Sequence, residues 1–518
     1  MVSRTGLSVV AQAACFLFLL PGAFAQDAQT APVTRAKVEA VLPQFEELVQ
    51  RAIAGGQVPG LSIAIVAEDQ VVYLKGFGLR AVGKPEPVDA DTVFQLASFS
   101  KSISATVVAA VVGDGKIGWD AKITDLDPSF RLSEAWPTAQ LTVTDLFSHR
   151  SGLPGQAGDD LEGLGFDRTT ILERLRQVPL NGFRSTYSYS NFGITEGAVA
   201  MANAEGMDWA DLAETRLYKP LGMTATSSRY ADFLKQTDRA ALHVGGIGDW
   251  RLGPVHDPDA QSPAGGVSST ARDLAKWRRL ELSGGSFDGK PLINPEALAA
   301  THVPLMQRGK NPVTGASSFY GRGWNVEFGR YGLSWSHAGG FSVGARTLVS
   351  ILPDKGLGIV VLSNAFPTGL PEGLADSLFD LVLTGKVQTD WTQSWDKAYA
   401  GLNGPMMEAG KARFAHPPAN PTAALPDSAY LGRYANDYLG TAVVSAGKDG
   451  LVLGLGPAGA TRLPLTHFER DMFLIYPAPE VPDFPSAVAF TVGADGKAAS
   501  IHIESLDALG FGTLKRVD

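Results

Sequence analysis

Hydrophobic residues recur along this chain with two periods, and the period predicts the element. Apolar residues spaced three and four apart predict a helix over residues 38–54, and short apolar runs predict strands over 61–66 and 71–77. A helix rich in Ala and Val follows Ser98 and ends at Gly113-Asp114-Gly115. The chain is therefore expected to open with a helix, a hairpin and a second helix.

The middle of the chain is mainly helical, and strands return after it. We predict a helical region from about residue 145 to 217, broken by loops at 151–154 and around 181–182, and a helix at 271–282. Three strands at 331–336, 345–352 and 358–363 and a closing helix at 371–383 are predicted after it. Strands at both ends with helices between them indicate the α+β class. We expect one antiparallel sheet flanked by helices, a separate helical lobe, and a site in the cleft between them.

After residue 415 the pattern changes again. The run His416-Pro417-Pro418-Ala419-Asn420-Pro421 predicts an extended linker. Short β-type segments follow, with hairpin signals at Lys448-Asp449-Gly450 and Ala494-Asp495-Gly496. The predicted strands lie at 441–445, 451–455, 472–476, 487–492, 500–503 and 512–516. This pattern favours a small antiparallel barrel.

Length and charge limit the possible functions. A chain of 518 residues is too long for one ordinary core, so two folded domains are expected. Its 45% hydrophobic and 19% charged residues are typical of a globular protein, and a net charge of −9 leaves no basic surface for nucleic acid. The predicted segments are a signal peptide (1–25), a first domain (33–385), a helix and Pro-rich linker (386–427) and a barrel-like domain (428–518).

The N-terminus has the three parts of an export signal. Arg4 supplies a positive start, residues 9–20 form an apolar run, and Ala23-Phe24-Ala25 is a cleavage site. A retained membrane anchor is the alternative, but Pro21-Gly22 breaks the run, which is also too short for a span. Cleavage removes Cys15, the only cysteine, and with it any disulfide or thiol chemistry. We expect a periplasmic or secreted protein without stable membrane insertion.

Three short motifs, in one order, carry the candidate chemistry. They are Ser98-Phe99-Ser100-Lys101, Tyr189-Ser190-Asn191 and His337-Ala338-Gly339-Gly340. Together they supply a nucleophile beside a lysine, a phenol that can move protons, and a glycine-rich strand that can hold an oxyanion. These are the requirements for acyl transfer through a covalent serine ester.

The first motif combines a nucleophile with a base. Ser98 and Lys101 lie three residues apart at the start of a helix, so they share a face near the positive end of the helix dipole. A lysine removed from water has a lowered pKa and can act as a base. The alternative is chance spacing on the surface, because Ser394 and Lys397 are spaced in the same way. No phenol or glycine-rich strand follows that second pair.

The second motif supplies a phenol and an amide. Near a lysine, Tyr189 is expected to ionise below the usual phenol pKa of about 10 and to share the role of base. Asn191 can contact a substrate carbonyl or hold the lysine. The alternative is that these aromatic residues only pack the helical lobe, and Tyr187 is a rival to Tyr189.

The third motif follows a predicted strand. Gly339 and Gly340 let a substrate lie against the backbone. The N–H groups of Gly340 and Ser98 can form an oxyanion hole. We expect His337 to hydrogen-bond the phenol or the lysine; a purely structural histidine is the alternative.

A rival nucleophile is Ser342, in the G-x-S-x-G pattern Gly340-Phe341-Ser342-Val343-Gly344. That elbow requires a helix after the serine, whereas residues 345–352 have the pattern of a strand. We therefore place the nucleophile at Ser98.

With these motifs the chain resembles the serine β-lactamase-related family, which includes class C β-lactamases, D-Ala-D-Ala carboxypeptidases, D-aminopeptidases and family VIII esterases. The resemblance extends over about residues 38–383 and implies that fold. It also implies Ser98 as nucleophile, Lys101 and Tyr189 as the base pair, and Asn191 as a contact of substrate and lysine. The tail is similar to barrel-like C-terminal domains of some peptidase members.

One departure from the family narrows the expected activity. Class C β-lactamases carry Lys-Thr-Gly where this chain has His337-Ala338-Gly339, and Ala338 lacks the hydroxyl that helps bind a substrate carboxylate. Losing a charged hydrogen bond costs about 1.5–3 kcal/mol. We therefore expect an exported serine hydrolase for small esters or peptide-like amides, without metal or cofactor, with an oligomer possible through the C-terminal domain. A β-lactamase is the alternative within the class, and an inactive binder of cell-wall fragments is the alternative outside it.

Overall fold

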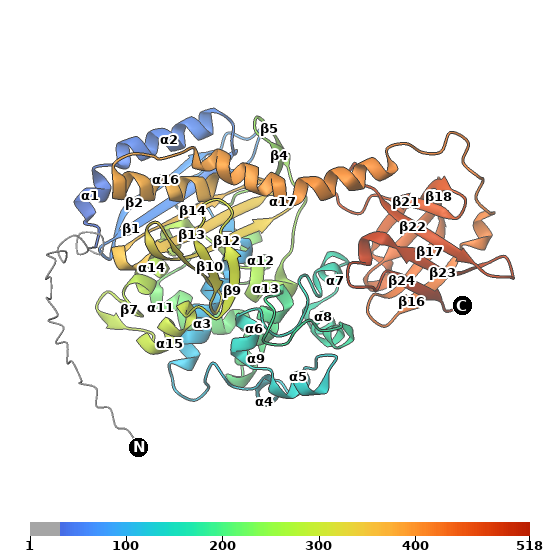
Figure 1. Ribbon diagram of the computed structural model, residues 1–518, viewed down its shortest axis with the longest axis horizontal. Coiled ribbons are helices and arrows are strands. Elements are labelled where there is room, and N and C mark those ends of the chain that lie inside the picture. The colour runs from blue at the N-terminus through green and yellow to red at the C-terminus, as the bar shows by residue number, and fades with distance from the viewer. Residues whose placement is uncertain (1–31) are drawn as a thin grey trace, which may run out of the picture.

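The computed structural model describes residues 32–518 as two bodies joined by one long helix (Figure 1). The larger body combines an antiparallel sheet with helices, which confirms the α+β class. The smaller body is formed of β-strands, and helix α17 (Trp391–Phe414) leads from one to the other. The predicted signal peptide at 1–25 lies outside the described residues.

Eight strands of the described chain form the central sheet, in the order β2-β1-β14-β13-β12-β11-β10-β9. Strands from the two ends of the domain meet at its centre, where Ile63 of β1 lies opposite Val361 of β14. The antiparallel sheet predicted from both ends of the domain is therefore present. The strand bounds are β1 (Gly60–Ala67), β2 (Gln70–Gly78), β9 (Met306–Lys310), β10 (Ser317–Tyr320), β11 (Asn325–Gly329), β12 (Gly332–Phe341), β13 (Ala345–Leu352) and β14 (Leu357–Ser363).

Helices cover both faces of this sheet. Helices α2 (Leu42–Ala54) and α16 (Leu370–Thr384) pack on one face, in a core that includes Phe45 and Leu378. Helices α3 (Ser100–Val112) and α14 (Ala271–Leu282) pack on the other (Figure 1). Because β1 and β14 are buried on both faces, they are continuous apolar runs, which is why the sequence predicted them well.

The helix predicted over residues 38–54 is divided in two. Helix α1 (Arg35–Glu39) ends before the chain turns at Ala40 and Val41, and α2 begins at Leu42. Pro43 occupies the first turn of α2, where its missing N–H removes no helical hydrogen bond.

The helical lobe is made of short helices, in keeping with the loops predicted within the 145–217 region. Loops interrupt it where Gly and Pro stand, as at Ser151-Gly152-Leu153-Pro154. The bounds are α4 (Ile123–Leu126), α5 (Ala135–Gln140), α6 (Val143–Phe147), α7 (Asp159–Gly163), α8 (Arg168–Arg174), α9 (Asn191–Ala204), α10 (Trp209–Ala213), α11 (Lys219–Leu221) and α12 (Tyr230–Lys235).

Short elements join the lobe to the sheet. Helices α13 (Ser262–Gly265) and α15 (Pro295–Ala299) pack against α3. The small strands are β3 (Phe94–Gln95) paired with β6 (Ser268–Ser269), β4 (His243–Gly246) between β5 (Asp249–Leu252) and β15 (Ala365–Phe366), and β7 (Ser286–Phe287) paired with β8 (Lys290–Pro291).

The C-terminal body is one nine-stranded, nearly closed barrel-like sheet, as the sequence predicted. Its strand order is β19-β18-β17-β16-β24-β23-β22-β21-β20. The six predicted strands are present, and three more that were not predicted complete it. The bounds are β16 (Gly432–Asn436), β17 (Gly440–Gly447), β18 (Gly450–Leu455), β19 (Thr461–Pro464), β20 (Thr466–Glu469), β21 (Met472–Ile475), β22 (Ser486–Val492), β23 (Ala498–Ile503) and β24 (Thr513–Arg516).

The barrel contacts the helical lobe at α7 and α8. The buried Tyr438 hydroxyl donates to Asp160 Oδ1 at 2.8 Å and accepts from the backbone N–H of Gly158 at 3.1 Å. Arg174 Nη1 donates to the carbonyl oxygen of Tyr438 at 2.7 Å. These contacts attach the barrel directly to the segment that begins α7.

Candidate active site

Ser98 and Lys101 lie where the chain enters helix α3. Ser98 is in a short 3₁₀ turn (Ala97–Phe99), and Lys101 is the second residue of α3. Ala97 has a φ of 49°, a conformation that costs energy for a residue other than glycine and that is common at functional sites. This turn directs Ser98 toward the lysine, as the spacing of the motif predicted.

The Lys101 amine is completely buried and has three oxygen partners. Nζ lies 2.9 Å from Ser98 Oγ, 2.7 Å from Asn191 Oδ1 and 2.9 Å from the carbonyl oxygen of Ala264. Burial lowers the pKa of Lys101 to about 7, although nearby Asp159 and Glu162 oppose the shift. A large share of the lysine is therefore neutral near pH 7, with its nitrogen in contact with the serine hydroxyl.

Asn191 connects the lysine to an acidic helix. Its Oδ1 accepts from Lys101, and its Nδ2 donates to both carboxylate oxygens of Asp159, at 3.2 and 3.1 Å. Burial raises the pKa of Asp159 to about 6 and that of Glu162, on the same helix α7, to about 8. Glu162 accepts a hydrogen bond from Gln261. Asn191 thus contacts the lysine, as predicted.

Tyr189 lies beside the lysine but differs from the expectation in one respect. Lys101 Nζ is 4.7 Å from the centre of the Tyr189 ring, and the His149 ring packs on that ring at 4.4 Å. Burial raises the pKa of Tyr189 above its usual value, and a contact with the Ser98 hydroxyl opposes this only in part. The pKa shift is therefore opposite to the predicted one, because partial burial disfavours a phenolate at this position.

The glycines of the third motif lie inside strand β12 rather than after it. A methyl group on Gly339 would overlap the Leu96 carbonyl oxygen and lie 3.0 Å from the backbone nitrogen of Phe99. The strand therefore packs directly on the turn that carries Ser98. Strand β11 pairs with β12 only up to Ser336, whereas β13 pairs with it through Phe341. Among the described strands, none pairs with the other edge of residues 337–341, which leaves that edge of β12 without a sheet partner.

His337 is placed differently from the prediction. Its Nε2 lies 2.9 Å from the Tyr320 hydroxyl and its Nδ1 lies 2.8 Å from the carbonyl oxygen of Ala338. Its ring centre is 6.5 Å from that of Tyr189, and it hydrogen-bonds neither that phenol nor Lys101. Burial, together with the charge of Lys101, lowers the pKa of His337 to about 3, so the ring is neutral.

Three site residues were not singled out from the sequence: Asp159, Glu162 and His149. The Nδ1 atom of His149 accepts from the backbone N–H of Ser190 at 3.1 Å and so holds the loop that carries Tyr189. Its φ is 57°. No local signal marks Asp159 or Glu162, because they reach the site through the packing of the lobe. His149 stands in the run Leu146-Phe147-Ser148-His149-Arg150.

Of the rival residues, Tyr187 borders this arrangement, whereas Ser342, Ser394 and Lys397 lie outside it. The Tyr187 ring packs on His149 and Tyr320, and the Arg308 guanidinium lies 5.4 Å from the centre of that ring. Ser342 is in the hairpin between β12 and β13, not before a helix, and donates to Glu480 at 3.1 Å. Ser394 and Lys397 do not bond to each other. The Ser394 hydroxyl donates to the carbonyl oxygen of Asp390, the residue before α17, and Lys397 donates to Gln393 Oε1 on the same helix.

The described residues, 32–518, contain neither a metal-binding cluster nor a membrane-spanning helix. Within that range no group of three or more His, Cys, Asp or Glu side chains is arranged to hold a metal ion. None of the helices in the same range is both long and apolar enough to cross a membrane.

The fold is that of the serine β-lactamase-related class. The Beta-lactamase family matches residues 45–382, well over half of the chain, so the chain belongs to that family. A second family, described as a domain of unknown function (DUF3471), matches residues 416–513 and so includes most of the barrel.

Curated relatives support this assignment. An unguisins hydrolase of Aspergillus campestris is 26% identical over 76% of this chain and 75% of its own length. Penicillin-binding protein 4 of Amycolatopsis lactamdurans is 26% identical over 62% of this chain and 83% of its own. The D-alanyl-D-alanine-carboxypeptidase/endopeptidase AmpH of Escherichia coli is 23% identical over 63% of this chain and 85% of its own length.

Solved structures share the fold of the whole chain. An octameric penicillin-binding protein homologue from Pyrococcus abyssi matches with a TM-score of 0.58 at 19% identity, over 91% of this chain and 99% of that one. The structure of SurE matches with a TM-score of 0.52 at 23% identity, over 93% of this chain and 99% of that one. Both matches therefore include the barrel as well as the larger body.

Proposed function

We propose that this protein is an exported serine hydrolase that forms an acyl-enzyme on Ser98 and acts on small esters or peptide-like amides. The observation that carries the proposal is the buried Lys101 amine, which has a pKa lowered to about 7 and lies 2.9 Å from Ser98 Oγ. A neutral amine at that distance can remove the hydroxyl proton as the oxygen attacks a carbonyl carbon.

The acylation step forms one bond and breaks another. Ser98 Oγ bonds to the substrate carbonyl carbon while Lys101 takes the hydroxyl proton. The N–H groups of Ser98 and Gly340 stabilise the oxyanion. Tyr189, a neutral phenol between the lysine and the cleft, donates its proton to the departing nitrogen or oxygen and regains one from Lys101. The carbon–nitrogen or carbon–oxygen bond then breaks, and the serine ester remains.

Deacylation reverses these roles with water. A water oxygen attacks the ester carbonyl carbon, and its proton passes to the neutral base pair of Lys101 and Tyr189. That proton is delivered to Ser98 Oγ as the ester bond breaks, which releases a carboxylic acid and restores the serine. Each cycle consumes one water and needs no further reactant.

The substrate class is supported by relatives and by one missing hydroxyl. The names of the unguisins hydrolase and of the AmpH carboxypeptidase/endopeptidase both denote hydrolysis. At the middle position of the third motif, Ala338 offers no hydroxyl to a β-lactam carboxylate. We expect esters and peptide-like amides to be turned over well and β-lactams poorly. Export is proposed from the pattern of residues 1–25. Assembly of an oligomer through the barrel is a separate proposal, tested by measuring the molecular mass in solution before and after deletion of that domain.

The test compares two chromogenic substrates on the mature protein. Wild type and Ser98→Ala are assayed with p-nitrophenyl butyrate and with nitrocefin, including the pre-steady-state burst. The proposal predicts a burst and turnover with the ester that are absent in Ser98→Ala. Fast nitrocefin turnover would instead identify a β-lactamase, and ester turnover that persists in Ser98→Ala would exclude Ser98 as the nucleophile.

A further inference from the structure

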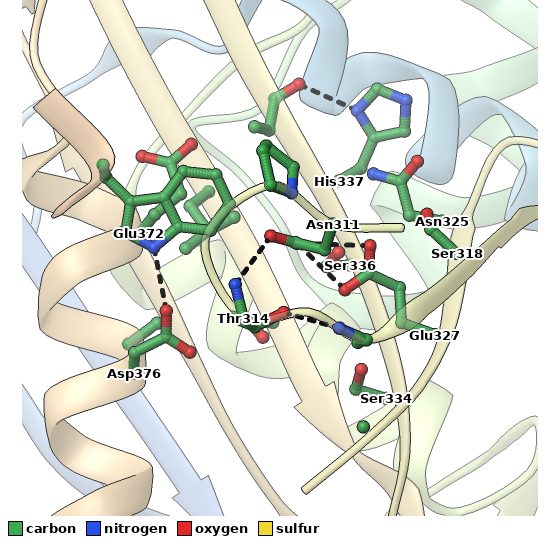
Figure 2. Close-up of a pocket in the computed structure, with 18 of the residues that line it drawn as sticks. Asn311, Thr314, Ser318, Asn325, Glu327, Ser334, Ser336, His337, Glu372 and Asp376 are labelled. Atoms are coloured by element: carbon green, nitrogen blue, oxygen red, sulfur yellow. Dashed lines mark hydrogen bonds between the residues drawn. The ribbon is translucent and has the colours of Figure 1, made fainter. Parts of the chain in front are cut away.

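A groove leads away from the site along one face of the sheet (Figure 2). Its volume is about 400 Å³, within the roughly 300–1,000 Å³ typical of ligand sites. Tyr189 and His337 are among its lining residues, so the groove borders the candidate active site. Residues of α16 and α17 form a wall farther along, and Figure 2 shows Glu372 and Asp376 on the helix side, away from the strands that carry Ser318 and Glu327.

The register of the sheet gives this groove a polar floor. Residues that lie directly opposite on neighbouring strands share a face, and two such rows line the cavity. They are Ser318–Glu327–Ser334 on β10, β11 and β12, and Asn325–Ser336–Ser350 on β11, β12 and β13. The rest of this sheet face is apolar and is covered by α2 and α16. The polar rows occupy the part that the helices leave open.

The floor is recessed rather than freely exposed. A hairpin loop that includes Asn311 overhangs it, and Asn311 Nδ2 donates to both Glu327 carboxylate oxygens, at 3.3 and 3.2 Å. Burial raises the pKa of Glu327 above its usual value. A carboxyl group held in a concave, partly dehydrated cavity is typical of a binding site rather than of an ordinary solvated sheet face.

The charges beside the helices already have partners within the protein. Glu372 bonds to Arg346, and Asp376 accepts from the indole N–H of Trp395 at 2.8 Å. What the floor offers a ligand is therefore mainly hydroxyl and amide groups. Such groups match the alternating N–H donors and carbonyl acceptors of a peptide backbone.

We propose that this groove binds the leaving-group part of an extended peptide substrate, an inference that rests on the proposed function. Tyr189 protonates the leaving group in that mechanism and also forms the start of the groove, so the departing chain faces into it. The lining extends along β12 from Ala338 to Gly332. That length of strand is about 20 Å, which accommodates about six residues of extended peptide. Small esters leave the groove empty.

The test varies only the leaving group. Butyrate esters of glycolamide, of a glycolyl dipeptide amide and of a glycolyl tetrapeptide amide, all uncharged, share one acyl group and one scissile ester bond. In wild type, kcat/KM is expected to rise at least tenfold from the shortest to the longest ester. Ser334→Trp, which fills the groove floor, is expected to bring that ratio close to one.

Phe328→Trp is the matched control. Phe328 is on β11 next to Glu327, is 48% exposed and does not line the groove, so the same new side chain lies outside it. This variant should keep the tenfold ratio. The number of active sites in each variant is counted by the ester burst, which separates misfolding from loss of binding.

The outcomes separate this inference from the proposed function. Two results would overturn the groove assignment without affecting the proposed hydrolase function. One is a ratio of kcat/KM, longest to shortest ester, below two in wild type. The other is a ratio in Ser334→Trp as large as that of wild type. Absence of any Ser98-dependent ester cleavage would instead refute the proposed function.

Discussion

At the scale of single residues, the central feature is a lysine held without water. Lys101 has no exposed surface, and its three oxygen partners do not compensate for the loss of hydration, so its pKa falls to about 7. The Tyr189 phenol is partly buried, and burial shifts its pKa in the opposite direction, since burial disfavours the charged form of either group. In the proposed mechanism the two residues therefore have different roles, with Lys101 as the base and Tyr189 as a neutral proton carrier.

This division predicts a pH dependence. Activity should rise with pH about a midpoint near 7, because only neutral Lys101 can accept the Ser98 proton. The carboxylate of Asp159 raises the pKa of Lys101, so Asp159→Asn should move the midpoint to lower pH. The measurement is kcat/KM for p-nitrophenyl butyrate from pH 5 to 9. A midpoint that moves upward in Asp159→Asn would contradict the assignment of Lys101 as the base.

Acid stability tests the neutral histidine. The pKa of His337 is lowered to about 3 in the folded protein, against about 6.5 in an unfolded chain. Between these values the unfolded state binds the proton and the folded state does not. The stability that His337 contributes is therefore complete above pH 6.5 and is lost as pH falls toward 3. His337→Gln should flatten the decrease in urea midpoint over that range, and an unchanged slope would argue against a buried neutral ring.

Residue spacing alone could predict only the part of the site whose residues are close along the chain. The contact between Asn191 and Lys101, which are 90 residues apart, was expected instead from the set of motifs and the family they resemble. Ser98 and Lys101 meet because a helical turn brings residues three apart together. Asp159 and His149 could not be predicted, because their distance to the site depends on how separate loops pack. The partner of His337 was predicted incorrectly for the same reason: Tyr320 reaches it from strand β10.

At the scale of elements, the contact between β12 and the Ser98 turn sets the geometry of the site. Gly339 permits this contact, since any side chain there would meet the Leu96 carbonyl oxygen. The sequence predicted a strand that ended at 336, before the glycines, because glycine is depleted in strands. Strands β9, β10 and β11 were missed because they are short and largely polar. Strands β13 and β14 were found because they are continuous apolar runs.

Paired glycine substitutions test this contact. Gly339→Ala should destabilise the protein by about 1–3 kcal/mol or more, because backbone and not a flexible side chain must move. Gly340→Ala is the matched control, since a methyl group there would lie 3.1 Å from the Arg346 guanidinium, which can shift. Urea unfolding of both variants gives the measurement. Equal losses of stability would show that the strand does not pack on the turn as described.

At the scale of the whole molecule, the barrel is part of the environment of the site. Tyr438 of the barrel bonds to Gly158 and Asp160, which flank Asp159 in sequence, and Asp159 in turn holds Asn191. The two bodies and the barrel class could be predicted from changes in pattern along the chain. Their contact could not, because it depends on the path of α17 and on side chains far apart in sequence.

The barrel contact predicts an effect at a distance. Tyr438→Phe keeps the ring but removes the hydroxyl, which leaves Gly158 N–H without that acceptor and costs about 1–3 kcal/mol. We expect a severalfold lower kcat and a shifted pH midpoint, because Asp159 is less firmly held. Tyr430→Phe is the control: its hydroxyl bonds to Asp471 within the barrel, and its loss should leave kcat unchanged. Equal effects of the two variants on kcat would show that barrel stability alone matters.

The most direct test of the account is to locate the covalent intermediate. The mature protein is treated with an activated-serine phosphonate probe, and the modified peptide is found by mass spectrometry, in wild type and in Ser98→Ala, Ser342→Ala and Ser394→Ala. The account predicts one label per chain, on Ser98, absent in Ser98→Ala and retained in the other two variants. Equal labelling of wild type and Ser98→Ala, or a label on Ser342 or Ser394, would contradict it.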